Sequence, residues 1–456
     1  MGPDVPAPAP AGAGSAAVAS VQVASPRPRM LSSPPMRDAD LQHAIAETWR
    51  AESPKVIAAL VRMVRDLDLA EELAQDALVN ALERWPASGL PDNPGAWLMA
   101  TAKHRAIDHL RRQQLQLRKH AQIAQELDGL HDELHAARED ALDDDIGDDL
   151  LRLIFVACHP LLSPQARVAL TLRLLCGLTT DEIARAFLVP EATVAQRIVR
   201  AKRTLGEADA AFEVPRREQL PERLSAVLGV VYLVFNEGYA ATAGDDWMRP
   251  GLCAQALRLG RLLVELVPGE AEAFGLLALM ELQASRTAAR TGPDGEPVLL
   301  ADQDRARWAP AAIERGLAAL AQARRLSPAP GSYTLQAGIA ACHARAASVD
   351  ATDWGQIVAL YDALELVSPS PVVTLNRAVA VSMHAGPGEA LALVDALVEV
   401  PALRAYHLLP AVRGDLLHRL GRGGEARAEF LRAAQLTRNS RERGLLLARA
   451  DEAAPG

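Results

Sequence analysis

Apolar residues recur at the spacing of an α-helix through most of the chain. In one stretch they stand at steps of three and four, at Ala70, Leu73, Ala77, Ala81 and Trp85. This spacing describes one face of a helix. The apolar residues are mainly Ala, Leu and Val, and aromatic residues make up only 4% of the chain, a composition that favours packed helices over sheets. We therefore predict an all-α fold.

Composition divides the 456 residues into five zones, as expected for a chain too long for one hydrophobic core. Residues 1–36 are rich in Ala, Pro and Gly, lack a basic leader before an apolar run, and are predicted to be a disordered tail. A helical block at 40–113, an acidic linker at 114–149, a compact block at 150–206 and a helical block at 220–456 follow. No uncharged apolar stretch reaches the length of a membrane span.

The net charge of -9 is concentrated in one segment. From Glu126 to Asp149, eleven acidic residues stand against one Arg, a local balance of -10. The remainder is nearly neutral and contains basic clusters, so an acidic chain can still bind nucleic acid. We interpret the acidic segment as a solvated spacer that repels DNA and holds the basic blocks apart.

Cysteine usage points to a reducing compartment. Four cysteines lie far apart without a CxxC motif, at Cys158, Cys176, Cys253 and Cys342, and we expect reduced thiols in the cytoplasm. The pair Cys158 and His159 lacks two further metal ligands at a suitable spacing, so buried thiols are the preferred interpretation. We expect no metal site and no cofactor.

The block at 40–113 combines an acidic helix face with a basic helix. Four polar residues at steps of four, four and three share one face of the first helix and form the acidic ridge: Glu72, Asp76, Asn80 and Glu83. The next helix opens at Pro94 and carries Lys103, Arg105, Arg111 and Arg112. An ordinary solvated face would explain the ridge alone. Together, ridge and basic helix indicate two partners, a basic protein surface and a phosphate backbone.

The block at 150–206 has the pattern of a helix-turn-helix, with a generic helical hairpin as the alternative. Thr179 stands three residues before Glu182, as in a capping box at a helix start, and Ala184 is small where a second helix must cross. Residues 188–190 form the turn, and Pro190 suits the entry to the next helix. The buried stripe of that helix is predicted at Val194, Ile198, Ala201 and Leu205. Its opposite face carries a local charge of +3 between 190 and 205, which fits a recognition helix in the major groove.

These motifs resemble a known family. DLDLAEELAQDALVNALERW followed by NPGAWLMATAKHRAIDHLRR resembles region 2 of extracytoplasmic-function sigma factors of the sigma-70 family, and the block at 150–206 resembles region 4. The resemblance implies a region 2 helical bundle that binds core RNA polymerase through Glu72, Gln75, Asp76 and Asn80. It also implies backbone contacts at the minus-ten element of the promoter from Lys103, His104, Arg105, Arg111 and Arg112. Residues 88–93 would then hold an unstacked base, although no aromatic residue stands there, and Trp97 is better explained as core.

Region 4 of this family reads the minus-thirty-five element with its recognition helix. Side chains near the helix start reach base edges, and those further along meet phosphates. We therefore expect Thr193, Gln196 and Arg197 to contact bases, and Glu191 to accept a hydrogen bond from a cytosine amino group. Phosphates are assigned to Arg200, Lys202 and Arg203.

The pattern of the block at 220–456 predicts a domain of helical repeats, and the repeat length is close to that of tetratricopeptide repeats. GEALALVDAL at 388–397 is echoed by GEARAEFLRAA thirty-six residues later, and looser echoes start at Pro268, Pro328 and Pro369. The segment 285–308 interrupts the repeats and is interpreted as a turn-rich loop with buried salt bridges rather than as a catalytic or metal site. Repeats of this kind bind proteins or pack within the chain.

This C-terminal block resembles the extension of one sigma-factor group, in which it replaces or supplements an anti-sigma protein. We expect Asp302, Asp304 and Arg305 to dock it against region 4 and to regulate activity. The chain is therefore expected to be a promoter-specific sigma factor and not an enzyme, with polymerase and promoter DNA as partners. The alternatives are a helix-turn-helix regulator with a protein-binding repeat domain that never joins polymerase, and an enzyme whose catalytic motifs were not found.

Overall fold

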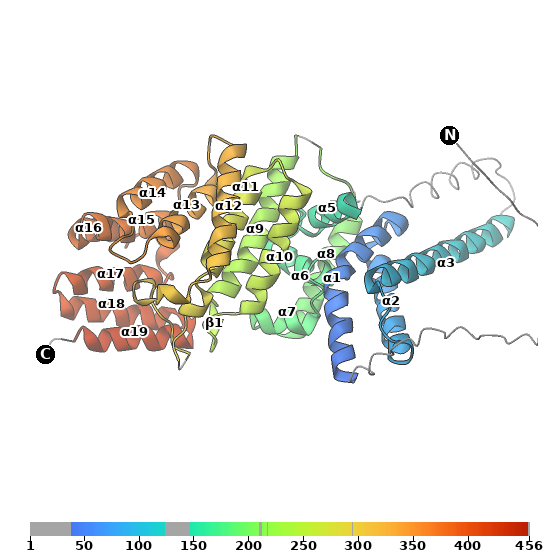
Figure 1. Ribbon diagram of the computed structural model, residues 1–456, viewed down its shortest axis with the longest axis horizontal. Helices are drawn as coiled ribbons and strands as arrows, with labels where there is room; N and C mark the ends of the chain where they lie inside the picture. Colours follow the sequence, from blue (N-terminus) through green and yellow to red (C-terminus); the bar gives the residue numbers. More distant parts are fainter. Residues whose placement is uncertain (1–37, 124–145, 209–211, 217, 294, 455–456) are drawn as a thin grey trace, which may run out of the picture.

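The computed structural model of the protein describes residues 38–123, 146–208, 212–216, 218–293 and 295–454. Within these ranges nearly every element is a helix (Figure 1), so the all-α prediction is confirmed. The predicted tail at 1–36 lies outside the described residues. Of the predicted acidic linker at 114–149, only the two ends fall within them.

Three helices form the first block: α1 (Asp38–Val64), α2 (Leu67–Ser88) and α3 (Pro94–Ile123). α2 begins where the carboxylate of Asp66 accepts a hydrogen bond from the Leu69 amide at 3.0 Å, a cap worth ~1 kcal/mol. It ends at Gly89, whose φ of +79° favours glycine. The five residues of the predicted apolar stripe are all buried. Figure 1 shows the far end of α3 projecting from the body of the molecule.

The second block contains α5 (Ile146–Ala157), α6 (Pro164–Leu174), α7 (Thr180–Phe187) and α8 (Glu191–Glu207). α7 and α8 form the predicted helix-turn-helix. The capping box between Thr179 and Glu182 is complete, because each side chain accepts a hydrogen bond from the other residue's amide. The turn places Leu188 in the left-handed region with φ of +50°. The predicted stripe of α8 is buried throughout.

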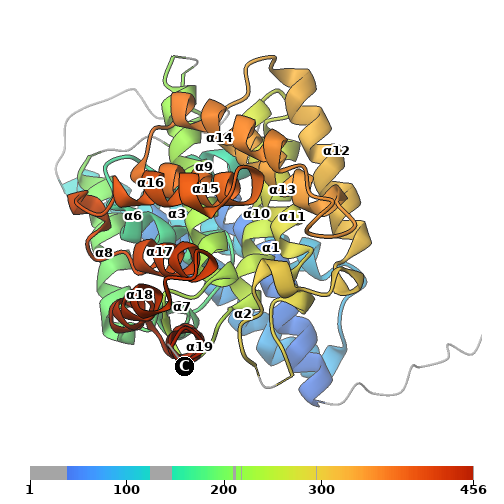
Figure 2. The same cartoon turned by 90° about the vertical axis from the view of Figure 1, so that its left-hand side faces the viewer.

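The C-terminal block is an array of helices in which most members pack on their neighbours in sequence, the arrangement of a repeat protein. Its helices are α9 (Leu220–Tyr239), α10 (Pro250–Leu266), α11 (Ala271–Ala284), α12 (Pro310–Leu326), α13 (Ser332–Arg345), α14 (Trp354–Val367), α15 (Pro371–His384), α16 (Pro387–Asp395), α17 (Leu408–Arg419), α18 (Gly423–Leu436) and α19 (Ser440–Glu452). Pro268, Pro328 and Pro369 all stand between helices, as their repeat echoes predict. Figure 2 shows α17, α18 and α19 below α14, α15 and α16.

Short elements join the array. The segment 285–308 contains three short 3-10 helices, η2 (Thr287–Ala289), η3 (Leu300–Asp302) and η4 (Arg305–Arg307), and a fourth, η5 (Pro401–Leu403), lies farther along. Two strands that the sequence pattern did not predict, β1 (Ala243–Gly244) and β2 (Arg438–Asn439), pair in parallel. Buried Asn439 donates to the carbonyls of Ala241 (3.0 Å) and Asp246 (2.8 Å). The end of the array is thereby tied to the loop after α9.

One hydrophobic core runs from the first block through the second and into the array. It contains Leu41 near its start and Met280 near its end, and α9 and α10 contribute to it as fully as α5 and α6 do. Further clusters fill the array, the largest of them over α15 to α19. The three blocks are therefore packed together, whereas the sequence analysis expected the linker to hold the basic blocks apart.

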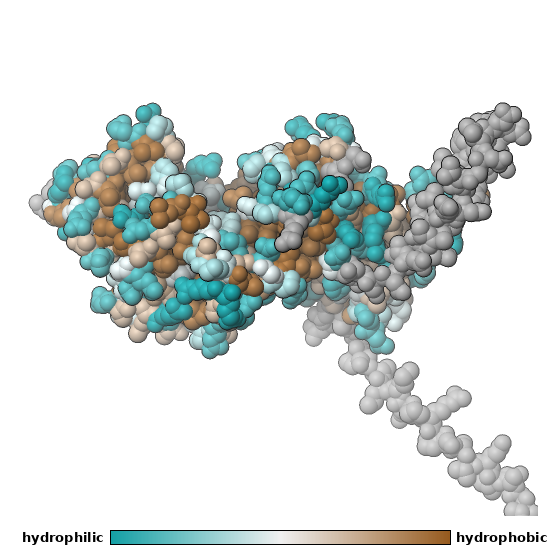
Figure 3. Space-filling model, turned by 90° about the horizontal axis from the view of Figure 1, so that it is seen from above, coloured by the Kyte–Doolittle hydropathy of each residue, from teal (hydrophilic) through white to brown (hydrophobic). Residues whose placement is uncertain are grey.

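The cysteines are buried, as the sequence analysis expected. All four cysteines are buried and free, and burial raises the pKa of the Cys158 thiol to about 11. In the part of the chain that the structure describes, no helix combines the length and the hydrophobicity that a membrane span requires. Figure 3 shows hydrophobic areas interspersed with polar ones over the array, and Leu366 on α14 is 87% exposed.

Candidate nucleic-acid interface

A groove between α2 and α3 brings the acidic ridge and the basic helix together. Its walls include three ridge residues and three of the predicted backbone contacts: Glu72, Asp76, Asn80, His104, Arg105 and Arg112. Trp97 also lines the groove and packs edge-on against buried Trp85, with ring centroids 5.3 Å apart. The two surfaces that the sequence analysis assigned to separate partners therefore share one groove.

Hydrogen bonds within and across the groove hold two of the four ridge residues, Asp76 and Asn80. Arg105 Nη1 forms an ion pair with Asp76 Oδ2 at 2.5 Å, and both side chains are about half exposed. Asn80 donates to the backbone carbonyl of Asp76 (3.2 Å), and Gln75 donates to Glu71 (3.0 Å). An ion pair this exposed contributes at most ~1 kcal/mol. Arg105 can therefore exchange Asp76 for a phosphate at little cost.

The other predicted contacts of α3 face solvent. His104, Arg111 and Arg112 are exposed, and Lys103 is half-buried. The loop at 88–93 is held by its own caps: Ser88 Oγ donates to the Arg84 carbonyl at 3.0 Å, and Asn93 Oδ1 accepts from the Ala96 amide at 3.0 Å. The capture of an unstacked base by this loop stays a prediction.

Two residues of α2 were missed by sequence reasoning. Val79 and Leu82 are apolar, yet their side chains are 51% and 45% exposed. With Glu72 and Gln75 they stand at steps of three, four and three, so the four share one face of α2. The signal was present in the sequence, because both apolar positions fall outside the buried stripe. An apolar centre with polar neighbours is typical of a protein-binding surface.

Helix α8, the predicted recognition helix, exposes part of its predicted polar face. Gln196, Arg200 and Arg203 are exposed, and Thr193 is half-buried. The exposed carboxylate of Glu191 accepts a hydrogen bond from Thr180 Oγ1 at 3.1 Å. Arg203 lies 3.4 Å from Glu207, both about 70% exposed, which leaves its charge available to a phosphate.

Unlike Gln196, Arg200 and Arg203, the side chain of Lys202 does not face solvent. Its Nζ lies 2.6 Å from Asp68 Oδ1 and 2.8 Å from Glu71 Oε2 of α2, and its side chain is only 10% exposed. Burial alone would lower the pKa of Lys202, but the charge of Glu71 and the hydrogen bonds to both carboxylates outweigh it and raise that pKa. Its predicted phosphate contact is therefore incompatible with this conformation.

Ion pairs join the first block to the second at several other points. Arg173 Nε lies 2.5 Å from Glu71 Oε1, and Arg50 Nη2 lies 2.7 Å from Glu182 Oε1. Burial alone would raise the pKa of Glu71, but the charges of Arg173 and Lys202 hold it below its usual value. α8 and α2 are thus locked by a buried carboxylate between two cations.

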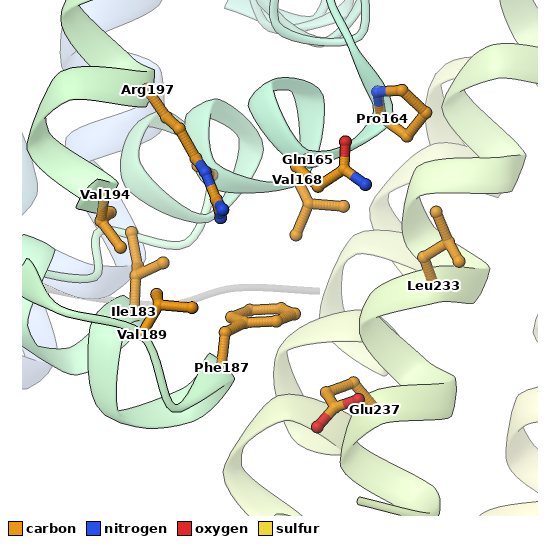
Figure 4. Close-up of a pocket in the computed structure, with 11 residues that line it drawn as sticks. Pro164, Gln165, Val168, Ile183, Phe187, Val189, Val194, Arg197, Leu233 and Glu237 are labelled. Carbon is orange, nitrogen blue, oxygen red and sulfur yellow. The ribbon is translucent and has the colours of Figure 1, made fainter. Parts of the chain in front are cut away.

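Arg197 also departs from the predicted outward face. Figure 4 shows its guanidinium directed toward a cavity between the helix-turn-helix and α9, on the side of Gln165 and Val168. The predicted contact of Arg197 with a base would need the side chain to leave this position.

The segment predicted to dock the C-terminal block lies elsewhere. Arg305 Nη1 donates to the backbone carbonyls of His343 (2.5 Å) and Ala346 (2.7 Å), so it holds α13 and does not form the expected salt bridge. Asp304 accepts from the amide of Ala306 at 2.9 Å, and Asp302 is exposed.

Contacts with residues 150–206 come from α9 and α10 instead. Arg223 Nη2 of α9 donates to the carbonyl of Phe155 at 2.7 Å, and Arg258 of α10 donates to the carbonyl of Leu175. These two hydrogen bonds join the first two helices of the C-terminal block to the helix-turn-helix block.

Three family models match the chain. Sigma-70 region 2 matches residues 48–116, Sigma-70 region 4 matches residues 152–205, and a family of unknown function (DUF6596) matches residues 223–324. An uncharacterized protein of Rhizobium meliloti (strain 1021) is 47% identical over 390 residues, which cover 85% of this chain and 91% of that protein. The chain belongs to the same family as that protein.

A more distant relative is named as a sigma factor. The probable ECF RNA polymerase sigma factor SigI of Mycobacterium tuberculosis is 28% identical over 170 residues, which are 37% of this chain and 57% of the relative. The match therefore spans little more than half of that sigma factor. The crystal structure of yeast Tom70 aligns over 91% of this chain and 85% of its own, with 12% identity and a TM-score of 0.30, which is too low to show a shared fold.

Proposed function

We propose that this chain, with its sigma-70 region 2 and region 4 domains, is an extracytoplasmic-function sigma factor that directs promoter-specific transcription initiation in the cytoplasm. The observation that carries the proposal is the order of the two matched domains, together with the surfaces that each presents. The first offers a protein-binding helix face beside a basic helix, and the second offers a helix-turn-helix with a cationic exposed face. Such a factor is not an enzyme.

Core polymerase would bind the exposed face of α2. Glu72 and Gln75 supply polar contacts, and Val79 and Leu82 supply an apolar centre that is 51% and 45% exposed. Apolar side chains at the centre of an interface carry more binding energy than charges at its rim. Asp76 and Asn80 belong to the same surface, with Asp76 held by Arg105 until DNA binds.

Promoter DNA would be bound at two places. The minus-ten element would lie along α3, against Lys103, His104, Arg105, Arg111 and Arg112. The minus-thirty-five element would be read by α8 through Glu191, Thr193, Gln196 and Arg197, with Arg200, Lys202 and Arg203 on the phosphates. Arg197 would have to turn away from the cavity, and Lys202 would have to leave Asp68 and Glu71 of α2, so in this proposal DNA binding requires the blocks to move apart.

The C-terminal block would modulate this transition as a tetratricopeptide-like extension. Its helices α9 and α10 complete the hydrophobic core of the helix-turn-helix block, and Arg223 and Arg258 bond to that block's backbone. The extension therefore stabilises region 4 and restrains its position. In this proposal the regulatory contact lies on α9 and α10 and not on Asp302, Asp304 and Arg305.

Binding to core polymerase tests the proposal against a helix-turn-helix regulator that never joins polymerase. The full chain should co-elute with bacterial core polymerase, and the double variant Val79→Asp, Leu82→Asp should lose this association because two charges are placed at the apolar centre. Leu366→Asp is the matched control, since Leu366 is 87% exposed and distant in sequence. Failure of the unaltered chain to bind core polymerase would leave the regulator as the better account.

A further inference from the structure

A cavity of about 190 Å³ lies between the helix-turn-helix and the first helix of the C-terminal block. Its apolar lining comes from four helices and the turn: Val168, Ile183, Phe187, Val189, Val194 and Leu233 (Figure 4). An apolar cavity of ~150 Å³ holds a benzene molecule. This one therefore has room for a single ring or a short alkyl chain.

Two charged side chains line the cavity, and they differ in their partners. Glu237 forms an ion pair with Arg249 and accepts a hydrogen bond from Thr242 Oγ1 at 2.9 Å, so its charge is already neutralised. Arg197 projects toward the cavity from α8, and none of the carboxylates in the described ranges forms an ion pair with it. The cavity therefore offers one unpaired guanidinium beside an apolar wall.

We propose that this cavity binds a small amphipathic monocarboxylate, with its ring or chain against the apolar wall and its carboxylate on Arg197. A guanidinium and a carboxylate form charge-assisted, bidentate hydrogen bonds. Burial of the apolar body supplies the rest of the affinity. A neutral molecule of the same shape lacks the first of these contributions and binds more weakly.

The position of the cavity gives the ligand a consequence that rests on the proposed function. Arg197 is one of the residues assigned to base contacts, and the ligand would hold it toward the cavity and away from DNA. The wall contains Leu233 of α9 as well as residues of α7 and α8, so the ligand would also favour the state in which α9 covers the helix-turn-helix. It would therefore lower affinity for promoter DNA.

Calorimetric titration of the full chain tests the binding directly. Benzoate should bind at least about tenfold more tightly than benzyl alcohol, which has the same ring without the charge. In the variant Arg197→Gln this preference should disappear, whereas the control Arg185→Gln, on α7 outside the cavity lining, should keep it. Absence of benzoate binding, or equal binding to Arg197→Gln, would overturn the proposal, as would equal affinity for benzoate and benzyl alcohol.

A second variant covers the case in which Arg197→Gln disturbs folding. Leu233 is 47% exposed, so Leu233→Trp adds bulk at the cavity wall without filling a closed core. This variant should abolish benzoate binding. Unchanged binding would place the ligand elsewhere and refute the site.

Added benzoate should also lower the affinity of the unaltered chain for promoter DNA. If benzoate binds and the chain binds no DNA, the proposed function fails while the ligand site stands.

Discussion

Glu71 is the buried carboxylate at the centre of one cluster of ion pairs between the two front blocks. Its carboxylate is 9% exposed and lies within 2.8 Å of both Arg173 and Lys202. Removal of one member of a buried ion cluster leaves the others without compensation, which costs several kcal/mol in measured cases. The same arrangement explains why α8 presents fewer cations to solvent than its sequence indicates.

Glu71→Gln should lower the free energy of unfolding at neutral pH by about 2 kcal/mol, because Arg173 loses its carboxylate partner and Lys202 keeps Asp68 but loses the buried charge of Glu71. The pKa of Glu71 is held below its usual value in the folded state, so its stabilisation is present above about pH 4.5 and is lost as the pH falls through the folded pKa. Denaturant titrations at pH 7 and pH 3 measure the difference, which should shrink at the lower pH. Exposed Glu72→Gln is the control, and an equal effect of both variants would contradict the account.

Gly244 is a second residue whose identity the structure requires. Its φ is +96°, and a Cβ there would lie 2.6 Å from Leu188 Cδ1 in the turn of the helix-turn-helix. Gly244 also belongs to β1, which pairs with β2 at the end of the array. The turn, the loop after α9 and the last repeat therefore meet at this glycine.

Gly244→Ala should destabilise the protein by about 1–2 kcal/mol, because the positive φ strains any residue with a Cβ, whereas the exposed tip of Leu188 can move aside at little cost. Gly229→Ala is the opposite case, since Gly229 lies inside α9 with nothing within 4 Å of an added Cβ. That change should stabilise by about 0.5–1 kcal/mol through helix propensity. Thermal unfolding of both variants measures the signs, and two changes of the same sign would refute this reading of Gly244.

The helix α8 is the element on which DNA recognition should depend most. Arg200→Gln and Arg203→Gln each remove one exposed cation from its face. Each should weaken DNA binding uniformly across sequences and reduce the slope of log affinity against log salt by about 1. Arg422→Gln, which removes an exposed cation from the far end of the array, should leave affinity and slope unchanged. Unaltered slopes for both α8 variants would show that this face does not meet phosphates.

Elements were predictable from the sequence wherever short-range patterns specify them. The stripe of α2 from Ala70 to Trp85 and the capping box of Thr179 and Glu182 depend on neighbours within four residues, and both are confirmed. The present position of Lys202 could not be predicted in this way, because its partners Asp68 and Glu71 stand about 130 residues away in the chain. Pairing of β1 with β2 joins residues 195 positions apart, and no local pattern reports such a contact.

At the scale of the whole molecule, the continuous core makes the C-terminal block a structural part of region 4. Val227, Val231 and Phe235 of α9 belong to the same buried cluster as Phe155 and other residues of the second block. The boundary predicted between the blocks at 150–206 and 220–456 marks a change of composition and not a gap in packing. The sequence shows where the composition of a chain changes, but not whether the segments on either side share a hydrophobic core.

If the chain ends after residue 215, the two front blocks that remain should therefore be less stable than they are in the full chain. Removal of α9 and α10 exposes apolar residues of α5 and α6 that those helices cover, at ~25 cal/mol per Å² of uncovered apolar surface. The truncated chain should unfold at a clearly lower temperature than the full chain or aggregate. An unfolding temperature equal to that of the full chain would show that the front blocks are as stable without α9 and α10 as with them.

Run-off transcription tests the central claim most directly. Purified full chain and bacterial core polymerase are combined on fragmented genomic DNA, and the transcripts are sequenced at their 5′ ends. The sigma-factor account predicts discrete start sites that share upstream elements, which disappear in the variant Val79→Asp, Leu82→Asp and persist in the variant Leu366→Asp. Transcripts identical to those of core polymerase alone, from a chain that is folded and binds DNA, would contradict it.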